Sequence, residues 1–403
     1  MAEKLKRNLG PWLLTAYGVG VMVGAGIYVL VGAVVAEAGI YAPVAFLFAG
    51  LIAAPSAMSY AELSTRIPEA AGESAYIDKG LGLHWLAVLV GLLIVLAGTV
   101  SAAAVLRGGV GYLLAVVDVP QIWAIIGLGV SLLLVAMVGV LGSLLLAALF
   151  TFIEVGGLFL VVWAGFLAPP VEAWTAVAAG TGPEFVFVGV AGAAALAFFA
   201  FIGFEDIVNM AEEVKRPERT MPRAILWSLA ITTALYIAVT LAAVRAVPAD
   251  VLAASSRPLV AVWEAGRGEN AAFLSIIAVI AALNGVLAQM IMASRVLFGL
   301  GRREAKLAVF YHSHPRFGTP VLATVLIGAA VIFSAILLPV SALAEGASIV
   351  LLSVFCIVNI ALIALKRKEP DAPFKVPVFV PWFGLLAAFA ALVASIGGLI
   401  GVF

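Results

Sequence analysis

The feature that most constrains this chain is a succession of long apolar segments separated by short polar ones. A helix rises about 1.5 Å per residue, so roughly 20 apolar residues cross a hydrocarbon core of about 30 Å. Apolar types make up 65% of the 403 residues and charged types 11%, whereas a soluble domain is about half apolar and about a quarter charged. Lys and Arg (22) equal Asp and Glu (22), which leaves no basic surplus for nucleic acid. The sequence predicts a polytopic membrane protein.

The apolar segments predict eleven membrane-spanning helices. The alternating polar positions of a transmembrane barrel are missing, so we expect an all-α protein. The predicted spans lie at about 12–36, 41–63, 83–113, 121–139, 143–167, 185–211, 222–247, 270–298, 319–338, 341–366 and 380–402.

The distribution of positive charge predicts the orientation. With the N-terminus in the cytoplasm, 18 of the 22 Lys and Arg residues fall on the inside and four on the outside. Cytoplasmic loops carry such an excess of Lys and Arg. An odd number of spans then leaves the C-terminus outside. The four outside residues are Arg107, Arg245, Arg257 and Arg267.

Two of the predicted spans are interrupted near their middles. The first has four glycines in the nine residues 18–26, and the sixth reads FFAFIGFED at 198–206, with two carboxylates at membrane depth. Glycines in membrane helices often serve only close helix packing. Two such breaks in comparable spans, five helices apart, favour the functional interpretation.

The spacing of the breaks predicts an inverted repeat. Five spans cross the membrane an odd number of times, so a second copy of the unit enters from the opposite face, and both breaks meet near the midplane. An unwound helix frees N–H and C=O groups that lipid cannot satisfy. N–H groups at 24–27 suit a carboxylate, and carbonyls near 22–23 and 201–203 suit an ammonium group. The pair describes a site for an α-amino acid.

Four motifs in order resemble the amino acid–polyamine–organocation (APC) superfamily. They are GVGVMVGAGIYVLVG in the first span, YAELSTRIPEAAGESAYI after the second, FFAFIGFEDIVNMAEEVKRPERTMPRAI through the sixth, and LNGVLAQMIMASRVLFGLGR in the eighth. The resemblance implies a five-plus-five inverted-repeat (LeuT-type) fold with alternating access and one additional C-terminal helix. On that reading the repeats cover residues 1–167 and 168–366, and residues 367–403 form the extra helix.

The resemblance also implies roles for individual residues. The carboxylate-binding break matches Val23, Gly24, Ala25, Gly26 and Ile27, and the stretch that takes the amino group matches Phe201, Ile202, Gly203 and Phe204. Phe199 matches an aromatic gate, and Glu205 an acidic residue that some relatives use in gating and pH sensing. The chain departs from the family pattern in the fifth span, where several proton-coupled relatives have a lysine and this chain has Glu154.

Glu154 and Glu205 are the candidate residues for proton coupling or gating. A carboxylate near the bilayer centre must be protonated, paired or hydrated, because an unpaired charge there is expensive. The functional interpretation is a proton carrier that is neutral in one transport state and charged in the other. The alternative is a permanently protonated side chain that hydrogen-bonds a neighbouring helix.

The sequence therefore predicts a secondary active transporter of amino acids in the plasma membrane, either proton-coupled or an exchanger. The phenylalanines around the second break favour small or medium neutral amino acids, while the carboxylates leave open polyamines, basic amino acids or other organic cations. A channel lacks a continuous polar path, an enzyme lacks a convergent set of catalytic groups, and a pump lacks a nucleotide-binding motif. No cofactor or metal site is expected, because His312 and His314 lack further ligands. The expected partners are the small-molecule substrate, protons and membrane lipid.

Overall fold

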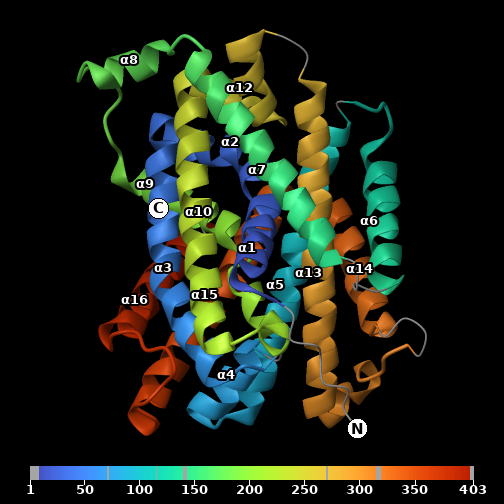
Figure 1. Ribbon diagram of the computed structural model, residues 1–403. Helices are drawn as coiled ribbons and strands as arrows, with labels where there is room; N and C mark the ends of the chain where they lie inside the picture. Colours follow the sequence, from blue (N-terminus) through green and yellow to red (C-terminus); the bar gives the residue numbers. More distant parts are fainter. Residues whose placement is uncertain are drawn as a thin grey trace.

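The computed structural model describes residues 9–69, 72–114, 116–138, 143–268, 271–314 and 319–399, and within these ranges the chain is almost wholly helical (Figure 1). The one β pairing among these residues is an isolated parallel bridge between Leu9 and Val214. The helices are α1 Pro11–Ala25, α2 Ile27–Ala38, η1 Gly39–Tyr41, α3 Ala42–Arg66, α4 Gly72–Leu81, α5 His84–Leu113, α6 Gln121–Val138, α7 Ser143–Leu167, α8 Glu172–Ala178, α9 Phe187–Ala197, η2 Phe198–Phe201, η3 Asp206–Glu213, α10 Pro217–Ala246, α11 Ala249–Ala254, α12 Pro258–Arg267, α13 Ala272–Arg303, η4 Ala305–Phe310, α14 Val321–Leu337, α15 Val340–Lys368 and α16 Phe379–Leu399.

The helices confirm the membrane-protein class. Among the described residues, eight helical segments are long and apolar enough to cross a membrane. Three shorter apolar helices, at Pro11–Gly24, Gln121–Met137 and Val321–Leu337, lie at other predicted spans. Eleven crossings therefore stay a prediction, and residues 139, 270 and 400–402 of the predicted spans lie outside the described part.

Several helices continue beyond the predicted spans. α13 extends to Arg303 instead of 298, and α10 begins at Pro217 instead of 222. The apolar pattern stops where charged residues begin, but the helix continues because its hydrogen bonds do not depend on lipid. The short helices α4, α8, α11 and α12 were not predicted, because they carry no long apolar run.

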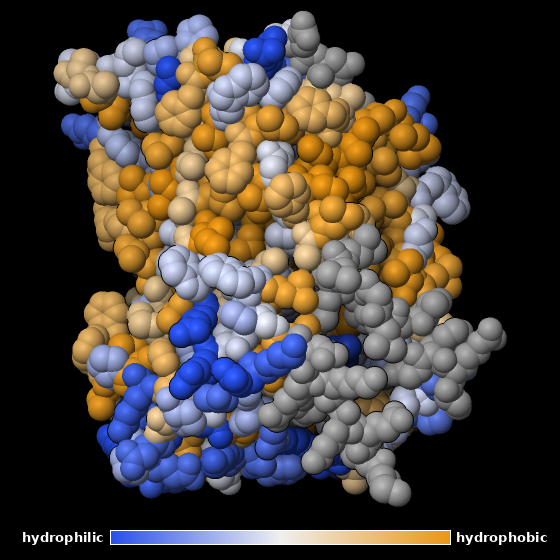
Figure 2. Space-filling view, in the orientation of Figure 1, coloured by the Kyte–Doolittle hydropathy of each residue, from blue (hydrophilic) through white to orange (hydrophobic). Residues whose placement is uncertain are grey.

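The bundle is arranged around α1, which packs against α7, α10 and α13 (Figure 1). α5 packs along α13, and α3 packs along α10. Figure 2 shows a wide apolar band across this side of the molecule and hydrophilic residues gathered at the lower end, around α4 in the view of Figure 1. The broken first span therefore lies inside the bundle, surrounded by other helices.

Two of the arginines predicted on the outside hydrogen-bond the ends of helices. Arg107 on α5 donates from Nη1 to the carbonyl of Ala335 near the end of α14, at 2.6 Å. Arg245 on α10 donates from Nη1 to the carbonyls of Gly165 and Ala168 at the end of α7, at 2.9 and 2.6 Å. The last carbonyls of a helix have no intrahelical donor, so these arginines supply one.

A buried cluster of charges joins α3 to α15. Glu62 accepts hydrogen bonds from Arg66 Nη2 at 2.6 Å and from the N–H of Val376 at 2.8 Å, and it pairs with Lys366 Nζ at 2.6 Å. The side chains of Glu62, Arg66 and Lys366 are almost completely buried. These contacts fix the lower ends of two helices that are about 300 residues apart in the chain.

Candidate functional site

The first predicted break lies at Gly26, which separates α1 from α2. Its backbone angles (φ −123°, ψ −64°) are not helical, and its N–H donates weakly to Val23 O at 3.4 Å. The first hydrogen bond of α2 runs from the N–H of Leu30 to Gly26 O at 3.0 Å. The N–H groups of residues 27–29 therefore have no acceptor within α2 and form the positive end of its dipole.

The second predicted break lies at Ile202 and Gly203. α9 tightens into η2, Ile202 then takes an extended conformation (φ −59°, ψ 128°), and Gly203 has φ +128°, which L side chains rarely adopt. The N–H of Gly203 donates to Glu205 Oε2 at 3.0 Å. The aromatic-glycine-acid pattern thus ends the helix where the sequence indicates, and Glu205 caps the freed N–H.

The two breaks touch each other. A Cβ atom on Gly26 would overlap Cα and Cβ of Ala200. A Cβ on Gly203 would lie 2.7 Å from Val21 Cγ1 and 3.2 Å from the N–H nitrogen of Met22. Real Cβ atoms essentially never come within 3.0 Å of another atom, so a side chain at Gly26 would displace the backbone of Ala200, and Gly203 in addition has a φ that favours glycine. The chain brings together two stretches that are about 180 residues apart in the sequence.

A tyrosine that sequence reasoning missed lies between the breaks. The hydroxyl of Tyr236, on α10, lies 2.8 Å from Met22 O and 2.8 Å from Ala200 O. Met22 is within the stretch predicted to offer carbonyls, and the carbonyl that shares the Tyr236 hydroxyl with it is that of Ala200, one residue before the predicted 201–203. Nothing in the apolar pattern of residues 222–247 singles out Tyr236.

The other predicted site residues are buried near the two breaks, but their side chains pack against different helices. Val23, Ile27 and Phe199 are fully buried. Phe201 packs edge-on against Tyr236, with ring centroids 5.2 Å apart, whereas Phe204 packs against Phe355 on α15, also at 5.2 Å.

Gly24 and Ala25 are the last two residues of α1, directly before the first break. A Cβ on Gly24 would lie 2.6 Å from the carbonyl of Ala281, so α1 approaches the backbone of α13 closely there. Ala25 ends α1, and its side chain lies outside the described part of the chain.

Glu154 lies between three helices, and its contact on α2 is in the first turn after the Gly26 break. Its side chain is fully buried on α7, and Oε1 accepts a hydrogen bond from Asn284 Nδ2 on α13 at 3.0 Å. Its backbone carbonyl accepts one from the Tyr28 hydroxyl on α2 at 2.9 Å. Oε2 has no hydrogen-bond partner among the described residues. The carboxyl group thus retains one unused oxygen, where a proton or a donor can act.

Glu205 belongs to a group of buried acceptors below the second break. Asp206 Oδ2 accepts a hydrogen bond from Gln289 Nε2 at 2.8 Å. Glu205, Asp206 and Gln289 line a narrow cavity that is too tight for a water molecule and whose other walls are apolar or glycine. Gln289 Oε1 has no partner among the described residues. Its oxygen atoms suit a proton in this arrangement, and a cation only once the surrounding helices separate.

A second residue that the sequence did not single out is Glu73, on the short helix α4. It is fully buried, and its helix begins against η3, since a Cβ on Gly72 would lie 3.0 Å from Asn209 Oδ1. Burial raises the pKa of Glu73 to about 8, and the negative charge of Glu205 adds to this effect. Its position in a loop between spans gave no signal of burial.

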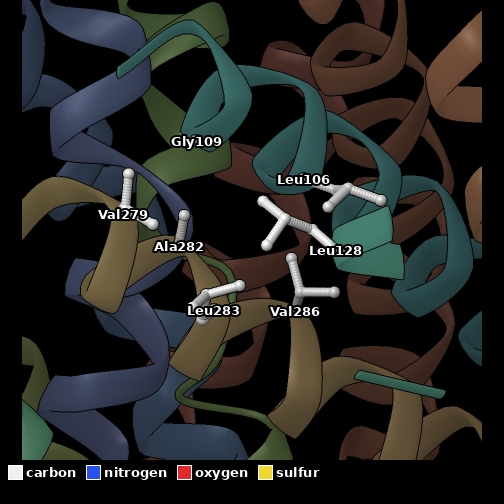
Figure 3. Close-up of a pocket in the computed structure, with 7 residues that line it drawn as sticks. All are labelled: Leu106, Gly109, Leu128, Val279, Ala282, Leu283 and Val286. Atoms are coloured by element: carbon white, nitrogen blue, oxygen red, sulfur yellow. The ribbon is translucent and has the colours of Figure 1, made fainter. Parts of the chain in front are cut away.

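A different cavity, also too tight for a water molecule, has no polar lining (Figure 3). It lies between α5, α6 and α13, and it is lined by Leu106, Gly109, Leu128, Val279, Ala282, Leu283 and Val286. None of these side chains offers a hydrogen bond, so a zwitterion would lose its hydration there without compensation. The paired breaks remain the candidate site.

Comparison with known sequences gives the chain a family and relatives. The model of the family described as "Amino acid permease" matches residues 9–401. The branched-chain amino acid permease BcaP of Bacillus subtilis (strain 168) is 30% identical, over 93% of this chain and 84% of that protein. The methylthioribose transporter of the same organism is 31% identical, over 96% and 87%. The human cationic amino acid transporter 4 is 31% identical, over 93% of this chain and 62% of its own length.

Comparison with solved structures identifies the architecture. The chain is similar to a Na⁺-coupled sialic acid symporter, solved in a substrate-bound outward-open state, with a TM-score of 0.62 and 12% sequence identity. The match covers 99% of this chain and 92% of that one. At this identity the likeness shows a shared fold and nothing about substrate or ion.

Proposed function

This chain belongs to the amino acid permease family, and from that premise we propose that it is a secondary active transporter that moves amino acids across the plasma membrane by alternating access. The observation that carries the proposal is the contact of the first break, at Gly26, with Ala200, just before the second break. Uncompensated backbone dipoles at membrane depth are tolerated only where they line a site.

The breaks offer complementary partners to the two charged ends of an amino acid. The carboxylate accepts hydrogen bonds from the first-turn N–H groups of α2, where the helix dipole favours negative charge. The ammonium group donates to the carbonyls of Met22 and Ala200, which already face one hydroxyl. Because Gly26 is packed against Ala200, substrate must separate the two breaks to enter.

That separation defines the moving parts of the proposal. α1, α2, α3, the α9–η3 segment and α10 rock as a unit against α5, α6, α13 and α14. We infer that the N-terminus is cytoplasmic and the C-terminus outside, because this orientation puts 18 of the 22 Lys and Arg residues on the inside.

Proton coupling through Glu154 or Glu205 is the proposed energy source, with exchange as the other mode. Glu154 has one unused carboxyl oxygen between α2, α7 and α13, and Glu205 is hydrogen-bonded to the second break itself. A change of protonation at either residue alters contacts between the moving helices and the rest of the bundle, which is what coupling requires.

The substrate class follows from the lining of the breaks. Phe199, Phe201 and Phe204 favour small or medium neutral amino acids, in keeping with the branched-chain relative. The second candidate is a cationic amino acid or polyamine, which the acceptor cavity at Glu205, Asp206 and Gln289 favours. In that case the cationic end of the substrate lies near the acceptor oxygens.

A thermal-shift screen of the purified protein tests the substrate. We expect at least one of the twenty amino acids to raise the Tm in a concentration-dependent way, since a ligand of the native state stabilises it. Methylthioribose and polyamines complete the panel. A rise with one of these and with no amino acid would contradict the proposed substrate class.

Uptake into proteoliposomes with an imposed pH gradient tests the coupling. We expect Glu154→Gln or Glu205→Gln to abolish accumulation driven by the gradient, whereas Glu184→Gln, at an exposed position between α8 and α9, leaves it unchanged. Undiminished accumulation in both variants would remove these acids from coupling.

A further inference from the structure

Tyr236 is held rigidly against both breaks. Its side chain is fully buried, and its ring packs edge-on against Phe46 on α3 and Phe201 on η2, with centroids 5.6 and 5.2 Å away. These contacts hold the hydroxyl oxygen at 2.8 Å from both Met22 O and Ala200 O.

Both carbonyls have lost the donor that a regular helix would give them. In an unbroken α-helix the N–H of Gly26 would bond to Met22 O, but here it donates to Val23 O. If the 3₁₀ turn continued, the N–H of Gly203 would bond to Ala200 O, but it donates to Glu205 instead. The two breaks therefore expose one carbonyl each toward α10.

One hydroxyl cannot satisfy both carbonyls at the same time. A tyrosine hydroxyl carries a single proton, so it donates to Met22 O or to Ala200 O, and the other carbonyl lacks this donor. An ammonium group carries three N–H donors and can satisfy both. A buried acceptor without a donor is unfavourable, so the closed, empty site is left one hydrogen bond short.

We propose that the Tyr236 hydroxyl stands in for the ammonium group of the substrate when the site is empty, and that this shortage makes Tyr236 a determinant of specificity for amines. The inference rests on the proposed function, since it takes the breaks as the amino acid site. A ligand with an amino group supplies the missing donors. A ligand of the same shape without one leaves the Tyr236 hydroxyl as the donor shared by both carbonyls.

Tyr236→Phe separates this role from a purely structural one. The affinity to measure is that of the amino acid found by the thermal-shift screen and that of its deaminated analogue, by competition against the labelled amino acid. We expect the variant to bind the amino acid about ten-fold more tightly than the wild type does, because its empty site leaves both carbonyls without a donor and the ammonium group then satisfies both. The deaminated analogue should bind the variant and the wild type alike, because its binding changes the donors of the two carbonyls in neither protein.

Tyr112→Phe is the matched control. The Tyr112 hydroxyl is equally buried but donates to one carbonyl only, that of Tyr28, at 2.7 Å. This variant should leave the ratio of the two affinities unchanged. An unchanged ratio in Tyr236→Phe, or an equal loss for both ligands, would overturn the inference. If the wild type binds no amino acid, the proposed function itself fails.

A measurement on the wild-type side chain covers the case in which Tyr236→Phe does not fold. Protein labelled with carbonyl-¹³C methionine contains eight labelled carbonyls, and a Met22→Leu sample identifies the band of Met22. Amino acid binding should shift that infrared band to lower frequency, because a stronger, charged donor replaces the shared hydroxyl. The deaminated analogue should produce no shift. A Met22 band that the amino acid leaves in place would overturn the inference.

Discussion

Glu73 is a buried carboxyl group whose ionisation depends on its packing. It lies on α4, outside the membrane-spanning helices, and its Oε1 has no hydrogen-bond partner among the described residues. Burial raises its pKa from 4.5 to about 8, with a smaller contribution from the negative charge of Glu205. At neutral pH the folded protein therefore holds Glu73 mainly in the neutral form.

Glu73→Gln should make stability less dependent on pH. Between pH 4.5 and about 8 the folded protein keeps a proton that the unfolded chain releases. The stabilisation is complete below pH 4.5 and is lost as pH rises through about 8. We therefore expect the Tm in detergent to fall between pH 5 and pH 8.5, and to fall less in the variant than in the wild type.

The control for this prediction is Glu184→Gln at an exposed position, which should follow the wild-type curve. Parallel Tm curves for the wild type and Glu73→Gln would contradict the effect of burial on this residue.

Residue-level prediction from sequence succeeded where the backbone carries the signal. Four glycines in the first span and the aromatic–glycine–acid stretch in the sixth marked both breaks in the sequence. Glycine permits backbone angles outside the helical region, and Gly203 adopts such an angle in the structure. Tyr236 and Glu73 could not be identified from the sequence, because their roles depend on residues far away in the chain. Tyr236, for example, meets Met22 and Ala200 only after folding.

At the scale of elements, the tie between α3 and α15 is made by buried charges. Glu62 faces Arg66 from its own helix and Lys366 from α15, and the N–H of Val376 completes its hydrogen bonds. Removing one partner of a buried charge leaves the remaining charge poorly compensated. The cluster therefore holds α15 and the segment before α16 against α3, one of the helices proposed to move.

Lys366→Met should lower stability clearly, whereas Lys375→Met should not. Lys366 is almost fully buried, so we expect a loss of about 3 kcal/mol in the free energy of unfolding. Lys375 pairs with Asp371 at 3.4 Å on the exposed surface, and such pairs contribute about 0–1 kcal/mol. Denaturation of both variants in mixed micelles measures the difference. Equal losses would contradict the assignment of the buried cluster as the tie.

At the scale of the whole molecule, the sequence predicted the architecture well. The five-plus-five inverted-repeat (LeuT-type) fold of an all-α polytopic membrane protein is confirmed by the structural match over 99% of the chain and by the family match over residues 9–401. The limits of the repeats at 167 and 366 stay predictions. Apolar length and the two breaks sufficed for this, because lipid admits few ways of satisfying a backbone.

The closed arrangement of the breaks could not be predicted from the sequence. Glycines at 24 and 26 indicated close approach, but not that Gly26 would lie on Ala200 or that Gly24 would lie on α13. Those contacts depend on how helices from both halves pack, which local pattern does not encode. The closed packing also explains why a hydroxyl, rather than an open cavity, occupies the space between the breaks.

The most direct test of the account is amino acid binding to Gly26→Ala and Gly127→Ala beside the wild type, by equilibrium dialysis with the labelled ligand. A Cβ at Gly26 projects onto Ala200 and fills the space between the breaks that the substrate would occupy, whereas Gly127, on α6, has no other atom within 4 Å of where a Cβ would be. We expect that Gly127→Ala binds like the wild type and that Gly26→Ala, still folded by its circular dichroism, loses binding at least ten-fold. Wild-type affinity in Gly26→Ala would contradict the claim that the paired breaks are the substrate site.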